Sequence, residues 1–347
     1  MSERDGAERS ARFPAVEWPN VTIVMLNWKT WWDSIACLEL LLRLTYPTYK
    51  VVVLDNGSHD CSVERIDAWA RMRLVTGWGS GVSTQAPPAV PHLRVIFDHP
   101  RLTLIALDEN LGFSGGNNLG LEYVLSDATP PEFVFLVNSD VRVEQDCLLE
   151  CVKVARRTKA ALVGATIKDD RGRILNVSSS FSRELLLLPS ETICPAETSE
   201  ESQPINRPEG AAMLLASEFL QFRRRTQGYF LDPAMFMYCE ELDLAECAKR
   251  SGFKVMLATR AVVYHRVSHE KGNSFAYYYD TRNRVRIARR FLPNPTRLAF
   301  HACYFPLRLR RAAAEWLGRR REVASAIMYG LYDGYKGVTG KWNKHPE

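Results

Sequence analysis

Short runs of apolar residues, rich in β-branched side chains, recur through the first part of the chain. They cover residues 21–26, 50–54, 102–106 and 132–137. Runs of this length predict buried strands. Between them, residues 31–44, the segment that ends near residue 73, and residues 115–125 have the spacing of helices.

This alternation of strands and helices predicts an α/β fold with a mostly parallel sheet and helices on both of its faces. Polar clusters stand at the ends of three predicted strands, at Asn27, at residues 55–58 and at residues 138–140. In open sheets of this kind, ligands bind beyond the carboxyl ends of the strands. We therefore expect a binding site where the three clusters meet.

The remaining chain divides into loops, one more strand and a helical end. Residues 76–92 and 189–208 are rich in polar residues and proline and predict loops, while residues 255–263 predict a strand. From Asn283 onward the spacing is helical, with a break at Pro293 and Pro295. We expect a flexible leader at 1–18, one domain at 19–290, and a basic amphipathic helical region at 291–347.

Charge is distributed unevenly. The 347 residues carry a net charge of +5, yet residues 282–321 hold twelve arginines and one acid, Glu315. Such a segment predicts a polyanionic partner, which could be anionic lipid, a lipid pyrophosphate or nucleic acid. The polar residues 1–10 do not form a secretory signal, no apolar run approaches ~18 residues, and none of the eight cysteines forms a CxxC pair. We expect a cytoplasmic protein that lies on the inner face of the cell membrane.

Residues 110–118 (NLGFSGGNN) place three glycines and three asparagines before a predicted helix. Glycines allow the backbone to approach a ligand closely, and a helix N-terminus favours negative charge. A tight turn capped by asparagine explains the same residues equally well. The segment is not a GxGxxG motif after the first strand, which argues against a nicotinamide-binding domain.

Three further positions carry candidate chemistry. Asp140 ends a buried strand, where a carboxylate can bind a divalent cation or simply cap a turn. Glu240, Glu241 and Asp243 are close enough to raise one another's pKa if buried, which suits a general base, although acids are also common at helix starts. His265 follows a predicted strand and could complete a metal site or be structural.

In this order, these segments resemble the family-two glycosyltransferases of the GT-A fold, in particular the rhamnosyltransferase-like branch that builds cell-surface polysaccharides. The resemblance extends from about Val21 to Arg290. It rests on seven pieces, which are residues 26–28 (LNW), 55–58 (DNGS), 110–118, 138–140 (NSD), 236–244 (FMYCEELDL), 261–265 (AVVYH) and 278–283 (YYDTRN).

The resemblance implies an inverting transfer of a sugar, with rhamnose the first expectation, from a nucleoside-diphosphate sugar to a hydroxyl of a glycan or lipid-linked acceptor. It implies a Rossmann-like GT-A sheet with a C-terminal helical extension. The residues expected along the nucleotide sugar are Asn27, Asp55, Asn56, Ser58, Asn110, Gly112, Gly116 and Asn138. Of these, Asp55 and Ser58 would contact the base and ribose.

The resemblance also implies a Mg²⁺ or Mn²⁺ ion bound by Asp140 and His265, and a catalytic base at Glu241. Two departures from the family pattern bear on these roles. Asn138 stands where the metal-binding triplet usually begins with Asp, and Glu241 stands where the base is usually Asp. Glu240 therefore competes for the role of base, and Asp243 completes the acidic cluster.

The basic segment 282–321 mixes arginines with aromatic and aliphatic residues, as helices lying on anionic lipid do. A helical bracket packed on the domain is the alternative. Two other functions remain open: a degenerate member that binds the nucleotide sugar without turnover, and a nucleic-acid-binding protein that uses the basic segment. No nucleic-acid-binding motif is present, so we expect no nucleic acid partner. A nucleotidyltransferase is disfavoured, because Asn27 to Lys29 stand where its glycine-rich loop would begin.

Overall fold

A computed structural model describes residues 17–75, 90–175, 201–265 and 273–343. Most of the predicted loops at 76–92 and 189–208 and nearly all of the predicted leader lie outside these ranges. Within the second predicted loop, residues 202–204 form a short strand instead. The strands are β1 (Val21–Asn27), β2 (Tyr49–Asp55), β3 (Leu93–His99), β4 (Leu102–Leu107), β5 (Phe133–Asn138), β6 (Val141–Val143), β7 (Ala160–Lys168), β8 (Ser202–Pro204), β9 (Ala212–Ala216) and β10 (Lys254–His265).

The helices follow the predicted spacing in the first half of the chain. They are α1 (Trp31–Leu41), α2 (Ser62–Leu74), α3 (Gly112–Leu125), α4 (Cys147–Thr158), α5 (Ser217–Gln227), α6 (Glu240–Arg250), α7 (Ser274–Phe291), α8 (Asn294–Leu317) and α9 (Arg321–Lys336), with a 3₁₀ turn η1 (Pro233–Met235) before α6.

One sheet runs in the order β3-β4-β2-β1-β5-β9-β7-β10-β6, and β8 pairs with β10. The strands β4, β2, β1 and β5 are parallel, as expected, whereas β9 is antiparallel to both of its neighbours. The strands β3, β6 and β8 are also antiparallel to their partners. The α/β fold class is confirmed, with a sheet that is more mixed than the apolar pattern indicates.

Two apolar clusters cover the two faces of the sheet. Leu38 of α1, Ile66 of α2 and Leu148 of α4 lie in one cluster, together with alternate residues of β1 and β2. Helices α3, α5 and α6 contribute to the other cluster. Because neighbouring strand residues point to opposite faces, Met25 belongs to the first cluster and Val24 to the second. The predicted helices on both faces are thus present.

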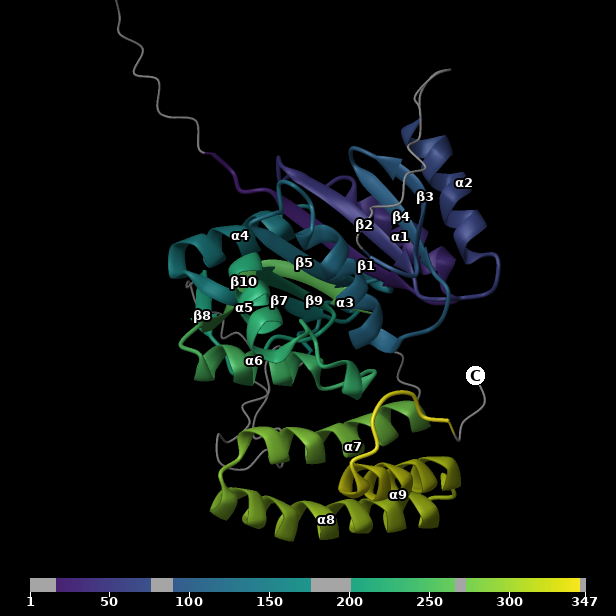
Figure 1. Ribbon diagram of the computed structural model, residues 1–347, viewed down its shortest axis with the longest axis vertical. Coiled ribbons are helices and arrows are strands. Elements are labelled where there is room, and N and C mark those ends of the chain that lie inside the picture. Colours follow the sequence, from purple (N-terminus) through teal and green to yellow (C-terminus); the bar gives the residue numbers. More distant parts are fainter. Residues whose placement is uncertain (1–16, 76–89, 176–200, 266–272, 344–347) are drawn as a thin grey trace, which may run out of the picture.

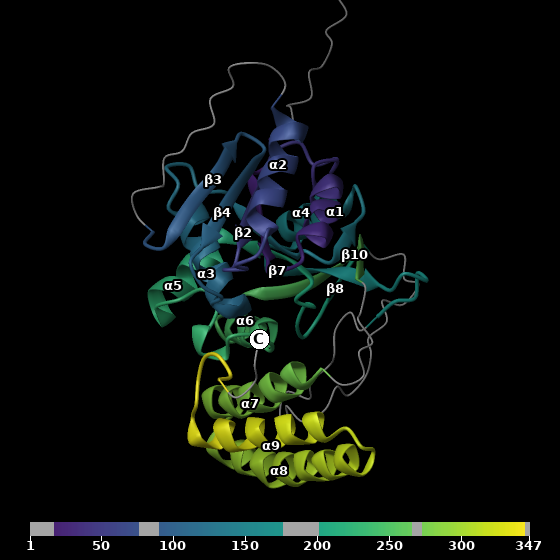
Figure 2. The ribbon, with the colours of Figure 1, turned by 90° about the vertical axis from the view of Figure 1, so that its right-hand side faces the viewer.

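Helices α7, α8 and α9 form a separate layer beyond α6, and α8 lies farthest from the sheet (Figure 1, Figure 2). A third apolar cluster joins this layer to the domain, with Met235 and Leu242 packed against Val285 and Phe300. The predicted break falls between α7 and α8, at Pro293. Helix α7 begins at Ser274, so it spans the expected boundary at residue 290, and that boundary stays a prediction.

None of the helices in the described ranges is both long enough and apolar enough to cross a membrane.

Candidate functional site

The ends of β1 and β2 meet in a buried network of polar side chains. The two strands are parallel, and Asn27 is the register partner of Asp55. The Asn27 amide donates to the Asp55 carboxylate at 2.6 Å, and the Ser58 hydroxyl donates to the same oxygen at 2.6 Å. Asn27, Asp55 and Ser58 are all at most 2% exposed. In this structure they hold the loop after β2, and Asp55 is already satisfied by protein donors.

A second loop interlocks with the first. Asn56 donates through its amide to the Gly112 carbonyl at 3.1 Å and to Asn110 Oδ1 at 3.2 Å, while Asn110 Oδ1 accepts from the Gly112 N–H at 2.8 Å. Gly112 has a φ of +71°, and a Cβ there would lie 2.3 Å from the Phe236 carbonyl oxygen. A Cβ on Gly116 would lie 2.6 Å from Leu26. Glycine is therefore required at 112 by both conformation and contact.

The end of β5 and the end of β10 also come together. The short strand β6 follows Asp140 and pairs antiparallel with β10, so that Val141 is opposite His265. The His265 Nε2 consequently lies 3.3 Å from the Asp140 Oδ2. The Asp140 side chain is 46% exposed and the His265 side chain 25%. Both expected metal ligands are adjacent and reachable from solvent.

These two side chains fit a divalent cation of the Mg²⁺ or Mn²⁺ kind. A carboxylate oxygen and an imidazole nitrogen are suitable ligands for manganese. In the described ranges no group of three His, Cys, Asp or Glu side chains gathers into a metal site. The protein would therefore supply two ligands, and the remaining ones would come from water and from the ligand itself.

A cavity of about 760 Å³ opens beside this pair, at the carboxyl ends of the strands. Asn138 and His265 line one side of it, and Met237, Glu240 and Glu241 line another. Of the residues expected along the nucleotide sugar, only Asn138 lines this cavity, in which a possible cation site and two carboxylates share one space. The lining does not include Asn27, Asp55, Asn56, Ser58, Asn110, Gly112 or Gly116.

Glu240 and Glu241 stand in different surroundings at the start of α6. Glu240 is 4% exposed, with Oε1 3.3 Å from the Ser114 hydroxyl. Burial, reinforced by the charge of Glu241, raises the pKa of Glu240 to about 8. The Glu241 carboxylate instead accepts a hydrogen bond from the Arg207 guanidinium at 2.6 Å. Both carboxyls line the cavity, and the geometry leaves the choice of base between them open.

Asp243 is occupied elsewhere. Its carboxylate accepts from Arg223 at 2.6 Å and from Arg290 at 2.8 Å, and it is 1% exposed. It does not line the cavity. A buried carboxylate between two arginines is an ion pair that supports α6 and α7, and this is the role that the geometry gives Asp243.

The sequence did not point to Glu209, which lines the cavity, or to the contacts that Arg207 and Asn283 make with lining residues. Arg207 and Glu209 lie next to Glu241, and burial raises the pKa of Glu209. Asn283 donates to the carbonyls of Met237 and Tyr238, each at 2.8 Å. Asn283 belongs to the segment 278–283, on which the family resemblance partly rests, but nothing in the sequence assigned it a role. No sequence pattern pointed to Arg207, because its partner Glu241 is 34 residues away in the sequence.

A model of the glycosyl transferase family 2 matches residues 89–208, which include β5 and Asp140. The chain contains a glycosyl transferase family 2 domain. The expected family is confirmed. Asn138 and Asp140 lie within the matched residues, and Glu240, Glu241 and His265 lie beyond them.

Two curated relatives match parts of the chain. The low-salt glycan biosynthesis hexosyltransferase Agl10 of Haloferax volcanii is 25% identical over 197 residues, 55% of this chain and 62% of that protein. The rhamnosyltransferase WbbL of Escherichia coli is 24% identical over 176 residues, 48% of this chain and 64% of that protein. The chain thus matches less than two thirds of the length of either relative.

Solved structures confirm that the fold is that of GT-A glycosyltransferases. The mannosyltransferase PcManGT from Pyrobaculum calidifontis, solved with GDP-mannose and Mn²⁺, superposes with a TM-score of 0.55 at 15% identity, covering 95% of this chain and 89% of that one. GalNAc-T7, solved with UDP, GalNAc and Mn²⁺, gives a TM-score of 0.53 at 13% identity, covering 77% of this chain and 48% of that one.

Proposed function

We propose that the family 2 domain transfers a sugar from a nucleoside-diphosphate sugar to a hydroxyl of a glycan or lipid-linked acceptor, with inversion at the anomeric carbon. One observation carries this proposal. The Asp140–His265 pair, 3.3 Å apart, stands at a cavity that also holds the carboxyls of Glu240 and Glu241. A cation site and a base are the two groups that such a transfer needs.

The donor would bind across the strand ends. The loops at 55–58 and 110–116 are fixed to each other by Asn56, so they offer a rigid wall to a nucleotide. Asp55 is buried and accepts hydrogen bonds from Ser58 and Asn27. We therefore propose that Asp55 holds the shape of this wall, and that the base or ribose contacts residues at the edge of the wall. Rhamnose is the sugar to test first, because WbbL carries that activity in its name.

Bound to Asp140 and His265, a Mg²⁺ or Mn²⁺ ion would offset the negative charge of the departing nucleoside diphosphate. The residues of the chain would do the rest. Glu241, held by Arg207 at 2.6 Å, takes the proton of the acceptor hydroxyl as its oxygen attacks the anomeric carbon. The new glycosidic bond forms on the face opposite the breaking bond to phosphate, which inverts the configuration.

We also propose that α8 and α9 rest on an anionic membrane surface on the cytoplasmic side, where a lipid-linked acceptor for cell-surface polysaccharide synthesis would be found. Two arginines of α7 are instead paired within the protein, Arg284 with Asp280 and Arg286 with Asp232. On α8 and the following turn, Arg310 and Arg319 are exposed beside Trp316 and Leu317, which are 53% and 82% exposed. Exposed arginine beside exposed apolar side chains suits an interface with lipid.

Turnover tests the proposal directly. The protein, with Mn²⁺, is incubated with single nucleoside-diphosphate sugars and a lipid-linked or glycan acceptor, and the product is examined by NMR. The account predicts a new glycoside of inverted anomeric configuration from one donor. A product of retained configuration would contradict the mechanism, and donor binding without turnover over the whole panel would indicate a degenerate domain.

A further inference from the structure

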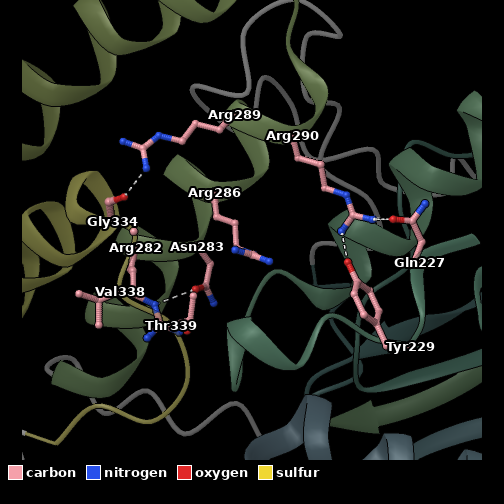
Figure 3. A pocket seen from close by; sticks show the side chains of 11 residues that line it. Gln227, Tyr229, Arg282, Asn283, Arg286, Arg289, Arg290, Gly334, Val338 and Thr339 are labelled. Carbon is pink, nitrogen blue, oxygen red and sulfur yellow. Dashed lines mark hydrogen bonds between the residues drawn. The ribbon is translucent and has the colours of Figure 1, made fainter.

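A second pocket lies between α7, the end of α9 and the loop after α5 (Figure 3). Its volume is about 340 Å³. Four arginines line it, and no acid does. They are Arg282, Arg286, Arg289 and Arg290, and we refer to this site as the arginine pocket.

The positive charge of the arginine pocket is only partly neutralised. The Asp232 carboxylate accepts a hydrogen bond from Arg286 at 2.7 Å, and the Asp243 carboxylate accepts one from Arg290 at 2.8 Å. Asp243 is shared with the buried Arg223, which adds a fifth guanidinium. Five arginines against two carboxylates leave an excess of three positive charges. Arginines that gather with fewer acidic partners than charges form a surface that favours an anion.

Two of the arginines have carbonyl partners and no carboxylate. Arg282 donates to the backbone carbonyls of Gly340 and Met235, at 2.6 and 2.7 Å. Arg289 donates to the carbonyls of Gly334 and Tyr335, at 3.1 and 2.9 Å. These bonds fix the direction of both side chains and leave their charge in place.

Arg286 supplies the donors. Its Nε donates to Asp232, and within the described ranges its two terminal nitrogens donate to no protein acceptor. The side chain is 40% exposed, and Figure 3 shows it between Arg282 and Arg290. A guanidinium whose fork is unused, among fixed cations, matches the oxygens of a phosphate group.

We propose that the arginine pocket binds a phosphate group, with Arg286 and Arg289 as its main donors. This goes beyond the proposed transfer reaction and does not depend on it, because the cavity at Asp140 and the arginine pocket share no lining residue. The same chemistry could be offered by a soluble phosphate or diphosphate or by a phospholipid headgroup. The test below separates the two sources.

The first arm measures inorganic pyrophosphate binding to the full-length protein by isothermal titration calorimetry in metal-free buffer. Arg286→Gln and Arg289→Gln should each weaken binding by at least about tenfold. Arg289→Gln removes no carboxylate pair, so it remains informative if Arg286→Gln misfolds. Arg94→Gln, at an exposed arginine of β3, makes the same charge change outside the pocket and should bind as the wild type does. Asp140→Ala should also leave binding unchanged, which excludes the donor cavity.

The second arm measures sedimentation with phosphatidylcholine vesicles that contain phosphatidic acid. Binding that falls in Arg286→Gln and Arg289→Gln but persists in Arg94→Gln identifies a lipid headgroup as the source of the phosphate. Pyrophosphate binding that falls in the pocket variants, with vesicle binding unchanged, identifies a soluble phosphate. If neither ligand distinguishes the pocket variants from the wild type, the proposal is wrong.

Discussion

The imidazole Nε2 of His265 lies 3.3 Å from the carboxylate of Asp140, although 125 residues separate them in the chain. The antiparallel pairing of β6 with β10 produces this contact, because it sets Val141 opposite His265. Neither side chain is buried in the domain, so the pair is open to a ligand. The metal proposal rests on this pair.

Asp140→Ala should abolish the stimulation of turnover by Mn²⁺ while leaving the fold intact, because the side chain is 46% exposed. Turnover against Mn²⁺ concentration measures the effect, and circular dichroism checks the fold. The exposed Asp170 offers a matched control, and Asp170→Ala should behave as the wild type does. Full metal-stimulated activity in Asp140→Ala would remove this residue from the metal site.

Glu241→Gln should lower kcat by at least about 10²-fold and leave nucleotide binding unchanged, because it removes the proton acceptor and keeps the shape of the side chain. Glu240→Gln is the matched variant one residue away. The two rate constants, measured side by side at saturating donor, decide the assignment. A large loss in Glu240→Gln with a normal rate in Glu241→Gln would move the base to Glu240.

The free energy of unfolding should depend on pH through the ionisation of the buried Glu240 carboxyl. Its pKa is raised from 4.5 to about 8, chiefly by burial. A raised carboxyl pKa stabilises the fold while the group is protonated, and this contribution is lost as the pH rises from about 4.5 through about 8. Urea unfolding of wild type and Glu240→Gln across this range measures it. The variant should lose less stability with rising pH; parallel curves would contradict a raised pKa.

Asn283→Ala should destabilise the protein by roughly 1–3 kcal/mol, because it leaves buried carbonyls without a donor. The amide donates to Met235, Met237 and Tyr238, in a segment where Phe236 and Tyr238 have left-handed φ angles of 64° and 66°.

Because Met237 and Tyr238 line the cavity, nucleotide affinity should fall as well in Asn283→Ala. Urea unfolding and nucleotide titration measure the two effects. Asn294→Ala, at an exposed asparagine, is the control. Unchanged affinity would show that the segment keeps its shape without Asn283.

Replacing Arg310, Arg319 and Arg321 together by Ser should reduce sedimentation with anionic vesicles, because these arginines are exposed. The contribution of each exposed basic residue near an anionic surface is about 1 kcal/mol. Arg311 and Arg320 are left in place, since both pair with Glu315. Equal sedimentation of variant and wild type would favour a helical bracket that packs on the domain without touching lipid.

The apolar runs were sufficient to predict β1, β2, β4 and β5, because each is buried on both faces and reads as continuous apolar sequence. They were not sufficient for β3, whose half-exposed edge residues alternate, or for β6, which has three residues. Strand direction is also absent from the pattern. Nothing local in the sequence shows that β9 runs antiparallel between β5 and β7.

The sequence predicted which residues belong to the candidate site better than it predicted the contacts that those residues make. Strand ends pointed to Asn27, Asp55 and Asp140, and the family resemblance paired Asp140 with His265. The sequence could not show that Arg207 engages Glu241 or that two arginines bury Asp243, because such contacts depend on the tertiary fold. Likewise, the sequence shows the positive charge of residues 282–321, but it does not show which of the arginines lie on the packed helix α7 and which on the exposed helix α8.

The most direct test of the account is a thermal-shift titration of the protein with nucleoside diphosphates and nucleotide sugars, with and without Mn²⁺, beside Asp140→Ala. A ligand that binds only the folded state raises the melting temperature. We predict a rise with one nucleotide that needs Mn²⁺ and is lost in Asp140→Ala. No rise with any nucleotide in the presence of Mn²⁺, or an equal rise in Asp140→Ala, would contradict a metal-dependent donor site at this cavity.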